Sequence, residues 1–378
     1  MRKYLLSIMV LLVLGSTALV VFSNSGLDVG QSKWLVMRYA MLTFAGVMLF
    51  YKDKWLLAYY VWLLFCLFTK DTPMTGQRMY VLFFALLFFW IIRTQLDKRN
   101  ARIILNGIAI LGIFHTILII IQSTGHWPLY KIMPKYLNAQ LWPGVCSDTN
   151  TGGSLLALCF PAFLRKRWCW GLIPIAIGLY LSQALGGVMA CFVGLVAYSC
   201  YRFDSKMLIT GILIIIVGFM GFYMVKKEPA RLKGNLGYRA DLIPLVVEQM
   251  VAHPIRGYGL GAFYWLFQFQ HKEHYKSKTL DGVVRSTTWR RAHNDYLEIA
   301  YNQGFIGLLL GLGFILSHMI KFVRKKKFET FALIGFVGVI IAMANSTVHF
   351  LWHTPAILMA IFYLALMINQ TEGTECMK

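Results

Sequence analysis

The sequence contains few charged residues, and few of these are acidic. Charged residues make up 14% of the 378 positions, and only 16 residues are Asp or Glu, whereas roughly 25% of a soluble domain is charged. Hydrophobic residues make up 58% of the chain, and the mean hydropathy is +0.60. This composition argues against a soluble globular domain and indicates a membrane protein.

The sequence also lacks the spacings of a metal site. It has no CxxC pair and no Cys/His cluster, which are the arrangements typical of structural zinc. Most of its cysteines lie inside apolar runs, so we assign them to packing and expect no metal and no cofactor. The seven cysteines are Cys66, Cys146, Cys159, Cys169, Cys191, Cys200 and Cys376.

A third absence concerns internal symmetry. No strict repeat appears, and the two halves of the chain contain no matching pair of interrupted apolar runs. Many secondary transporters are built from such repeats. This weakens the interpretation as a transporter or flippase of an anionic lipid or solute, which stays open as an alternative.

Long apolar runs recur along nearly the whole chain, each close to the roughly 20 residues that cross a bilayer. We predict an all-α polytopic membrane protein with about twelve transmembrane helices. The first run, MRKYLLSIMVLLVLG, resembles a signal peptide, but with so many spans behind it we expect it to be retained. The predicted spans lie near residues 4–22, 34–50, 54–69, 78–92, 102–121, 151–164, 169–183, 185–201, 207–224, 296–320, 329–347 and 351–369.

Lys and Arg residues fall on alternate loops between these runs, for example at 165–167 and 324–327. The positive-inside rule places these loops, and both termini, in the cytoplasm. Because so many basic residues are topology signals, the formal net charge of +21 does not indicate nucleic acid, and we expect no nucleic-acid partner.

One large loop falls on the external side. We divide the chain into a bundle of the first nine spans (1–224), this large loop (225–294), and a last part with three spans and a short cytoplasmic tail (295–378). Residues 225–292 contain twelve basic and five acidic residues, a net charge of +7. Such a charge suits anionic lipid headgroups or a bound polyanion such as pyrophosphate, which arginine binds through a planar set of donors.

The first part of the large loop has helical periodicity. In GYRADLIPLVVEQMVAHP, residues 237–254, apolar residues recur at helical spacing from Leu242 to Val251. This pattern predicts an amphipathic helix at the membrane surface. A turn-rich stretch with Gly257, Gly259 and Gly261 follows it.

The end of the large loop, RRAHNDYLEIAYNQGFIGLLL (290–310), concentrates polar residues directly before a predicted span. An imidazole at His293 would lie where water, headgroups and protein meet, and it can take a proton from a sugar hydroxyl. The simpler alternative is an interfacial histidine that binds headgroups or caps the helix. Asn294 or Asp295 can provide that cap, so His293 is not needed for it.

Arg239, at the start of the predicted helix, and Arg256, in the glycine-rich turn, are the first candidates for binding an anion. The alternative for each is an arginine that snorkels to the interface. Basic residues in charge runs are weaker candidates, namely Lys226, Lys227, Arg285, Arg290 and Arg291. An ionisable group inside a membrane is by default a functional hypothesis. Polar residues within spans or at their ends are Arg38, His115, Gln183 and His318, while His349 and His353 flank a short external loop.

The stretch HPIRGYGLGAF, followed after an insert by RAHNDYLEIAYNQGFIGLLL, resembles the signature of the O-antigen ligase and polymerase superfamily. These are bacterial inner-membrane glycosyltransferases with many spans and one large periplasmic loop. The family's histidine–asparagine pair matches His293 and Asn294, and the glycines of the next span match Gly304 and Gly307. The arginine that opens the loop helix matches Arg239.

The resemblance implies an all-helical fold similar to the C-type glycosyltransferases, with the active site on the periplasmic side of the bacterial inner membrane. The donor would be a glycan linked to undecaprenyl pyrophosphate and bound by Arg239, Arg256, Arg291 and Arg285. The acceptor would be a hydroxyl of a lipid or glycan, with the lipid A core among the candidates, and membrane lipids would be further partners. His293 would be the general base, and the resemblance implies no metal.

The acceptor is what separates the activities within this superfamily. We place an O-antigen or polysaccharide ligase first, with a repeat-unit polymerase and a protein O-oligosaccharyltransferase as alternatives. A structural or docking protein, for which His293 would be replaceable, is the alternative from another class.

Two segments depart from the family pattern. In GVCSDTNTGG, the customary phenylalanine and first asparagine are Cys146 and Asp148, Asn150 is the last asparagine, and Trp142 stands where an arginine is often found.

In LSQALGG, the customary Ser-Arg-Gly is Ala184-Leu185-Gly186. Two family arginines are therefore absent, which leaves open which basic residues bind the phosphates. Asn150, Gln183 and Asn294 are the residues expected to line the site beside them.

Overall fold

Helices dominate the structure, and the helical fold class is confirmed. The computed structural model describes residues 53–69, 85–86, 88–94, 96–124, 149–202, 229–270, 279–280, 283–284, 291–325, 329–349, 351, 354 and 356–372. Within them, strands occur in one hairpin, formed by β1 (Thr279–Leu280) and β2 (Val283–Val284). The predicted spans at 4–22, 34–50 and 207–224 lie outside the described residues.

Several helices coincide with predicted spans. In the described part of the chain, three helices are long and apolar enough to cross a membrane: α5 (Lys98–Ser123), α8 (Leu185–Arg202) and α13 (Asp295–Val323). The total of about twelve spans and the division into bundle, loop and last spans stay predictions. Shorter helices are α3 (Lys54–Thr69), α6 (Thr149–Cys159), η2 (Phe160–Leu164), η3 (Cys169–Gly171), α7 (Leu172–Ser182), α14 (Thr330–Ser346) and α15 (Ile357–Glu372).

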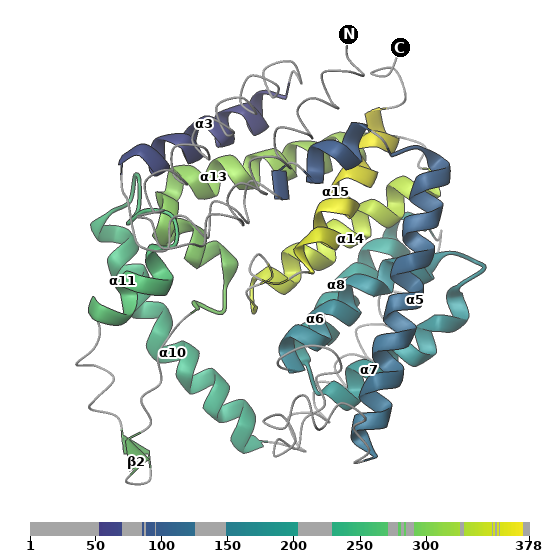
Figure 1. The fold of residues 1–378 in the computed structure, drawn as a ribbon, viewed down its shortest axis with the longest axis horizontal. Coiled ribbons are helices and arrows are strands. Elements are labelled where there is room, and N and C mark those ends of the chain that lie inside the picture. Colours follow the sequence, from purple (N-terminus) through teal and green to yellow (C-terminus); the bar gives the residue numbers. More distant parts are fainter. Residues whose placement is uncertain are drawn as a thin grey trace, which may run out of the picture.

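Two groups of helices meet at α13 and α14 (Figure 1). α14 packs against α8 and α15, and α6 packs against α7 and α8, while α13 pairs with α3. Small residues permit these close approaches, as is common for helices in membranes. A Cβ at Gly338 would collide with the Tyr363 ring, and a Cβ at Gly187 would press on the Gly153 backbone.

One face of α5 is apolar and exposed. Ile103, Ile110, Phe114 and Ile117 follow each other along it, and each is 47% exposed or more. Burial of such side chains is worth about 1.5–3 kcal/mol each in water, so a long exposed apolar stripe would be unfavourable there. The stripe fits a helix that contacts lipid.

The amphipathic helix predicted in the large loop is present as α10 (Pro229–Ala252). Leu242, Val246 and Met250 recur every fourth residue and are buried, whereas Val251 is 65% exposed. The buried stripe packs against α13. The next helix, α11 (Ala262–Gln270), adds Phe263 and Phe267 to the same cluster.

α13 is interrupted at Gly304, whose φ of 71° is outside the helical region. A break in a helix frees main-chain carbonyls, which need partners when they are shielded from water. Here three successive carbonyls accept hydrogen bonds: Tyr301 O from Tyr258 N at 2.9 Å, Asn302 O from Gly259 N at 2.9 Å, and Gln303 O from Trp62 Nε1 at 3.0 Å.

The glycine-rich turn between α10 and α11 docks into this break. Both backbones approach so closely that a Cβ at Gly257 would collide with Tyr301 O, and a Cβ at Gly304 with Ile255 O. Both glycines also have positive φ, which glycine adopts without steric cost. The glycines at 257 and 304 therefore join the large loop to the span that follows it.

Candidate functional site

A turn at the end of α14 connects the segments that carry the candidate site residues. We call residues 345–349 the α14 turn; Thr347 within it is the C-cap of α14. The carbonyls of Thr347 and Val348 are consecutive, and each accepts a side-chain hydrogen bond from a different part of the large loop.

Asn294 attaches the start of α13 to the α14 turn. Its Oδ1 accepts a hydrogen bond from Leu297 N at 3.1 Å, so Asn294 is the N-cap of α13. Its Nδ2 donates to Thr347 O at 3.0 Å. Of the two caps that the sequence allowed, Asn294 and Asp295, the structure uses Asn294, and the same amide attaches α13 to α14.

His293 lies one residue before this cap, with a left-handed backbone at φ 51°. Non-glycine residues rarely adopt this conformation, and they keep it where neighbouring contacts determine the backbone. The side chain is half-buried. The nearby end of α13 carries partial positive charge, which favours an anion beside it.

Arg239 of α10 reaches the neighbouring carbonyl of the α14 turn. Its Nη2 donates to Val348 O at 2.8 Å. The guanidinium is half-buried, and desolvation lowers its pKa from the usual value. Within the part of the chain that the structure describes, no carboxylate pairs with it. A partly buried cation of this kind suits an anion-binding site, because a bound anion would compensate its charge.

Arg291 differs from Arg239 because it has an internal partner. Its Nη1 lies 3.0 Å from Glu298 Oε1, with only 17% of the arginine and 3% of the glutamate side chain exposed. The guanidinium also lies 5.3 Å from the centre of the Tyr264 ring. The charge of Arg291 is therefore compensated within the protein.

Arg256 lies in another part of the large loop. Arg256 is exposed in the turn docked at the break of α13. From Asp295 to Gly304 a helix advances about 14 Å, so this turn lies a helix segment away from the start of α13. Arg285 lies outside the described residues, as do Arg290, Lys226 and Lys227.

α6 contacts the α14 turn at two points. Thr151 Oγ1 lies 3.3 Å from His349 Nε2, and Ser154 Oγ donates to Asn345 Oδ1 at 2.9 Å. Asn150 is in the first turn of α6, directly before Thr151, and is half-buried. The structure thus brings the Asn150 segment to the same turn as His293 and Arg239.

The segment that lacks the second family arginine also contacts the α14 turn. Gly186 faces Val348, because a Cβ there would lie 2.9 Å from Val348 Cγ2. Gln183 is the half-buried C-cap of α7, with a left-handed φ of 53°. Four separate parts of the sequence therefore meet at one turn.

Two other polar residues of the predicted spans, His318 and His115, are buried inside the protein. His318 Nε2 lies 2.7 Å from Asp53 Oδ2, which joins α13 to the start of α3. His115 is fully buried in α5. Arg38 and His353 lie outside the described residues. No group of three or more His, Cys, Asp and Glu side chains suited to a metal ion occurs among the residues that the structure describes.

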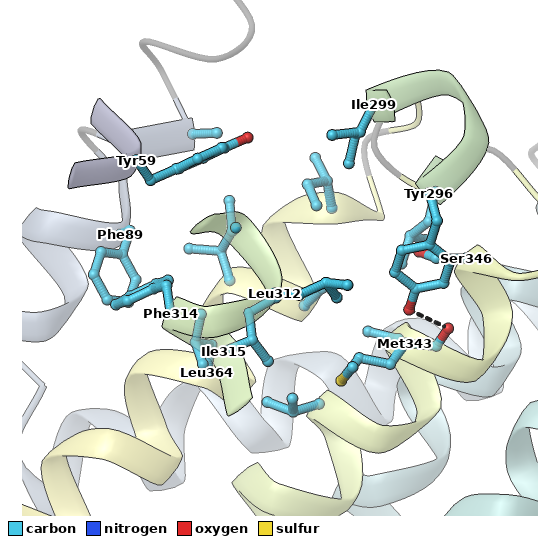
Figure 2. Close-up of a pocket in the computed structure, with 18 of the residues that line it drawn as sticks. Tyr59, Phe89, Tyr296, Ile299, Leu312, Phe314, Ile315, Met343, Ser346 and Leu364 are labelled. Carbon is cyan, nitrogen blue, oxygen red and sulfur yellow. Dashed lines mark hydrogen bonds between the residues drawn. The ribbon is translucent and has the colours of Figure 1, made fainter. Parts of the chain in front are cut away.

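An apolar cavity of about 110 Å³ begins beside the α14 turn. Figure 2 shows Tyr296 and Ser346 at one end and Phe89 at the other. Tyr296 donates its hydroxyl to Met343 O at 2.8 Å, across from α13 to α14. The walls include residues of α3, α13, α14 and α15 and of the segment with Ala85, Leu86 and Phe89, and their apolar side chains suit a hydrocarbon chain.

The sequence predicted His293, Asn294 and Arg239 as site residues but not the contacts that join their segments. Main-chain carbonyls such as Thr347 O and Val348 O have no signature in a sequence. The pairing of Glu298 with Arg291 was also not predicted. The place of Glu298 in the first turn of α13, seven residues after Arg291, was a signal that the two could pair.

The fold and the site define a helical membrane protein with a cation and an imidazole positioned at one end of its helices. Residues 170–312 match the family model described as O-antigen ligase. This match confirms the predicted resemblance to the O-antigen ligase and polymerase superfamily, whose members are glycosyltransferase-type enzymes, and it covers less than half of the chain. The matched residues include Arg239, His293 and Asn294. No curated protein matches the chain.

Proposed function

We propose that this protein is a glycosyltransferase of the bacterial inner membrane. It moves a glycan from undecaprenyl pyrophosphate to an acceptor hydroxyl on the periplasmic side. The observation that carries this proposal is the attachment of Arg239 and of Asn294, the neighbour of His293, to consecutive carbonyls of the α14 turn. The O-antigen ligase match includes both segments.

The proposed reaction is a single displacement at the anomeric carbon. The acceptor oxygen forms a bond to this carbon while the bond from the carbon to the pyrophosphate oxygen breaks, with inversion. His293 accepts the hydroxyl proton and later passes it to solvent or to the released pyrophosphate. The step involves no metal and no cofactor.

Arg239 has the role of stabilising the negative charge on the departing pyrophosphate. A guanidinium has five N–H donors, of which Arg239 uses Nη2 on Val348 O. Cationic donors in a partly dehydrated site stabilise developing charge well. Arg256 and Arg285 are proposed as further donors from the large loop, while Glu298 makes Arg291 the weakest of the predicted set.

The lipid part of the donor has a suitable environment nearby. Tyr296 and Ser346 connect the α14 turn with the apolar cavity between α13 and α14. A polyprenyl chain beside that cavity would keep its pyrophosphate at the membrane interface, where the site needs it.

An O-antigen or polysaccharide ligase is the first choice, with lipid A core as a candidate acceptor. A repeat-unit polymerase or a protein O-oligosaccharyltransferase would use the same donor chemistry. A transporter is disfavoured by the break in α13, because transporters use freed carbonyls to bind ions. Here the carbonyls of residues 301–303 accept hydrogen bonds from the protein.

The test is glycan transfer by purified protein in nanodiscs with an undecaprenyl-pyrophosphate-linked glycan as donor. We expect His293→Ala to lower kcat by about 10²–10⁴-fold, the usual contribution of a general base. Arg239→Ala should lower kcat/KM by about 10²-fold or more, because one donor to a developing charge is lost.

Arg202→Ala is the matched control, since this exposed arginine ends α8 away from the site, and it should behave as wild type. Undiminished transfer by His293→Ala would remove the general base. Wild-type protein without transfer from any such donor would refute the proposed function.

A further inference from the structure

The buried pair of Arg291 and Glu298 holds the backbone directly before His293. Besides the ion pair at 3.0 Å, the second oxygen of Glu298 accepts a hydrogen bond from Ala292 N at 3.5 Å. Two successive residues before His293 are therefore bound by one carboxylate in the first turn of α13.

The residue after His293 is fixed in a similar way. Asn294 accepts from Leu297 N at 3.1 Å and donates to Thr347 O at 3.0 Å. His293 thus lies at a corner between two attachments, of which one is made by Glu298 and the other by Asn294. This explains how a histidine keeps a φ of 51°, a conformation that persists only where the surroundings determine it.

The burial of the Arg291–Glu298 ion pair bears on its role in the protein. Removing two charges from water is unfavourable, and buried ion pairs are often no more stabilising than apolar side chains of similar size. Stability is therefore a weak reason for an Arg–Glu pair at this place. A specific backbone geometry is a better reason for the pair, because the Arg291 guanidinium and the Ala292 N–H must both lie within reach of the Glu298 carboxylate.

We propose that Glu298 is a positioning residue that acts through Arg291 and Ala292 to hold the His293 imidazole in its working orientation. This inference rests on the proposed general-base role of His293. It also assigns Arg291 to the protein's own architecture and not to the donor pyrophosphate.

The first test is Glu298→Gln, which removes the charge and keeps the shape. We expect kcat to fall by about 10–100-fold, as for other losses of groups that orient a reacting side chain. The KM for the donor should stay within about twofold, because Arg291 does not bind the donor. The rate at which diethyl pyrocarbonate modifies His293, followed by peptide mass spectrometry, should change in the same variant.

A second variant separates positioning from folding. Replacing both partners, Arg291→Met with Glu298→Met, leaves no unpaired buried charge, and such replacements are often neutral or stabilising. The double variant should unfold near the wild-type temperature, yet it should show the same loss in kcat and an altered His293 modification rate. Glu329→Gln is the matched control, because it breaks the exposed Lys98–Glu329 pair and should leave every readout unchanged.

Two results would overturn the inference. Wild-type kcat and His293 modification rates in both variants would show that the pair does not hold the imidazole. A raised donor KM with unchanged kcat would show that Arg291 binds the donor. Failure of the proposed function is distinguishable, because wild-type protein would then transfer no glycan while the modification rates still decide whether Glu298 holds His293.

Discussion

At the scale of single residues, Asn294 makes two different hydrogen bonds with one amide. Its oxygen caps α13, and its NH₂ group binds Thr347 O. Asn294→Asp keeps the capping acceptor but places a carboxylate oxygen against the Thr347 carbonyl. We expect the thermal unfolding temperature to stay near that of wild type, while transfer falls by about tenfold because the α14 turn shifts relative to His293.

Asn294→Ala is the companion variant, and it loses both bonds. It should destabilise the protein by about 1 kcal/mol, the usual cost of a lost N-cap, in addition to the loss of transfer. Thermal unfolding and transfer in nanodiscs measure the two effects separately. Wild-type transfer by Asn294→Asp would show that the bond to Thr347 has no part in the site.

The residue scale is also where sequence reasoning was most informative. Local rules predicted an N-cap at Asn294 or Asp295, and the structure has it at Asn294. The roles of His293 and Arg239 stay proposals, although the structure brings their segments to one turn. The pairing of Arg291 was not predicted, because a run of basic residues gives no information on which member meets a buried carboxylate.

At the scale of elements, the break in α13 determines how the large loop meets the bundle. Gly304→Ala places a side chain at φ 71° and against Ile255 O, so the turn with Arg256 must detach or shift. Strained backbone alone costs about 1–3 kcal/mol, and the collision adds to it. We therefore expect Gly304→Ala to lower the stability by at least 2 kcal/mol or so.

Gly311→Ala in the same helix is the control. The atoms nearest to its Cβ would be ring atoms of Tyr59, at 3.4 Å or more, and alanine favours helix over glycine by about 1 kcal/mol. Thermal unfolding and limited proteolysis of the turn at 253–261 compare the two variants. Equal stability and equal protection of the turn would mean that this close approach is absent in the membrane.

The helices that arise from a local sequence pattern could be predicted. Apolar length predicted α5, α8 and α13, and periodicity predicted α10. The break at Gly304 was not predicted, because the span was predicted as one uninterrupted segment from residue 296 to 320. Its cause is the docking of a turn nearly fifty residues earlier, and such a long-range contact leaves no periodic signal.

At the scale of the whole molecule, the ends of the helices separate into a basic side and the side with the site. Lys98 Nζ, at the start of α5, lies 3.1 Å from Glu329 Oε1, the N-cap of α14. Asn369 Nδ2 of α15 donates to Arg93 O at 2.8 Å. The α14 turn and the start of α13 lie at the opposite ends of their helices. The structure thus brings together the segments around Arg93, Lys98 and Glu329, which the sequence assigned to the cytoplasmic side of the membrane.

The orientation of this arrangement in the membrane can be tested with single cysteines. Glu248→Cys probes an exposed position of α10, the helix that carries Arg239, and Arg324→Cys probes the exposed end of α13, in a background with Cys146, Cys169 and Cys376 replaced by Ser. Because basic loops stay in the cytoplasm, a membrane-impermeant maleimide should label Cys at 248 in intact spheroplasts. It should label Cys at 324 only after the membrane is permeabilised. The reverse pattern would place Arg239 and His293 on the cytoplasmic side, and it would refute a periplasmic reaction even if the chemistry of the site were correct.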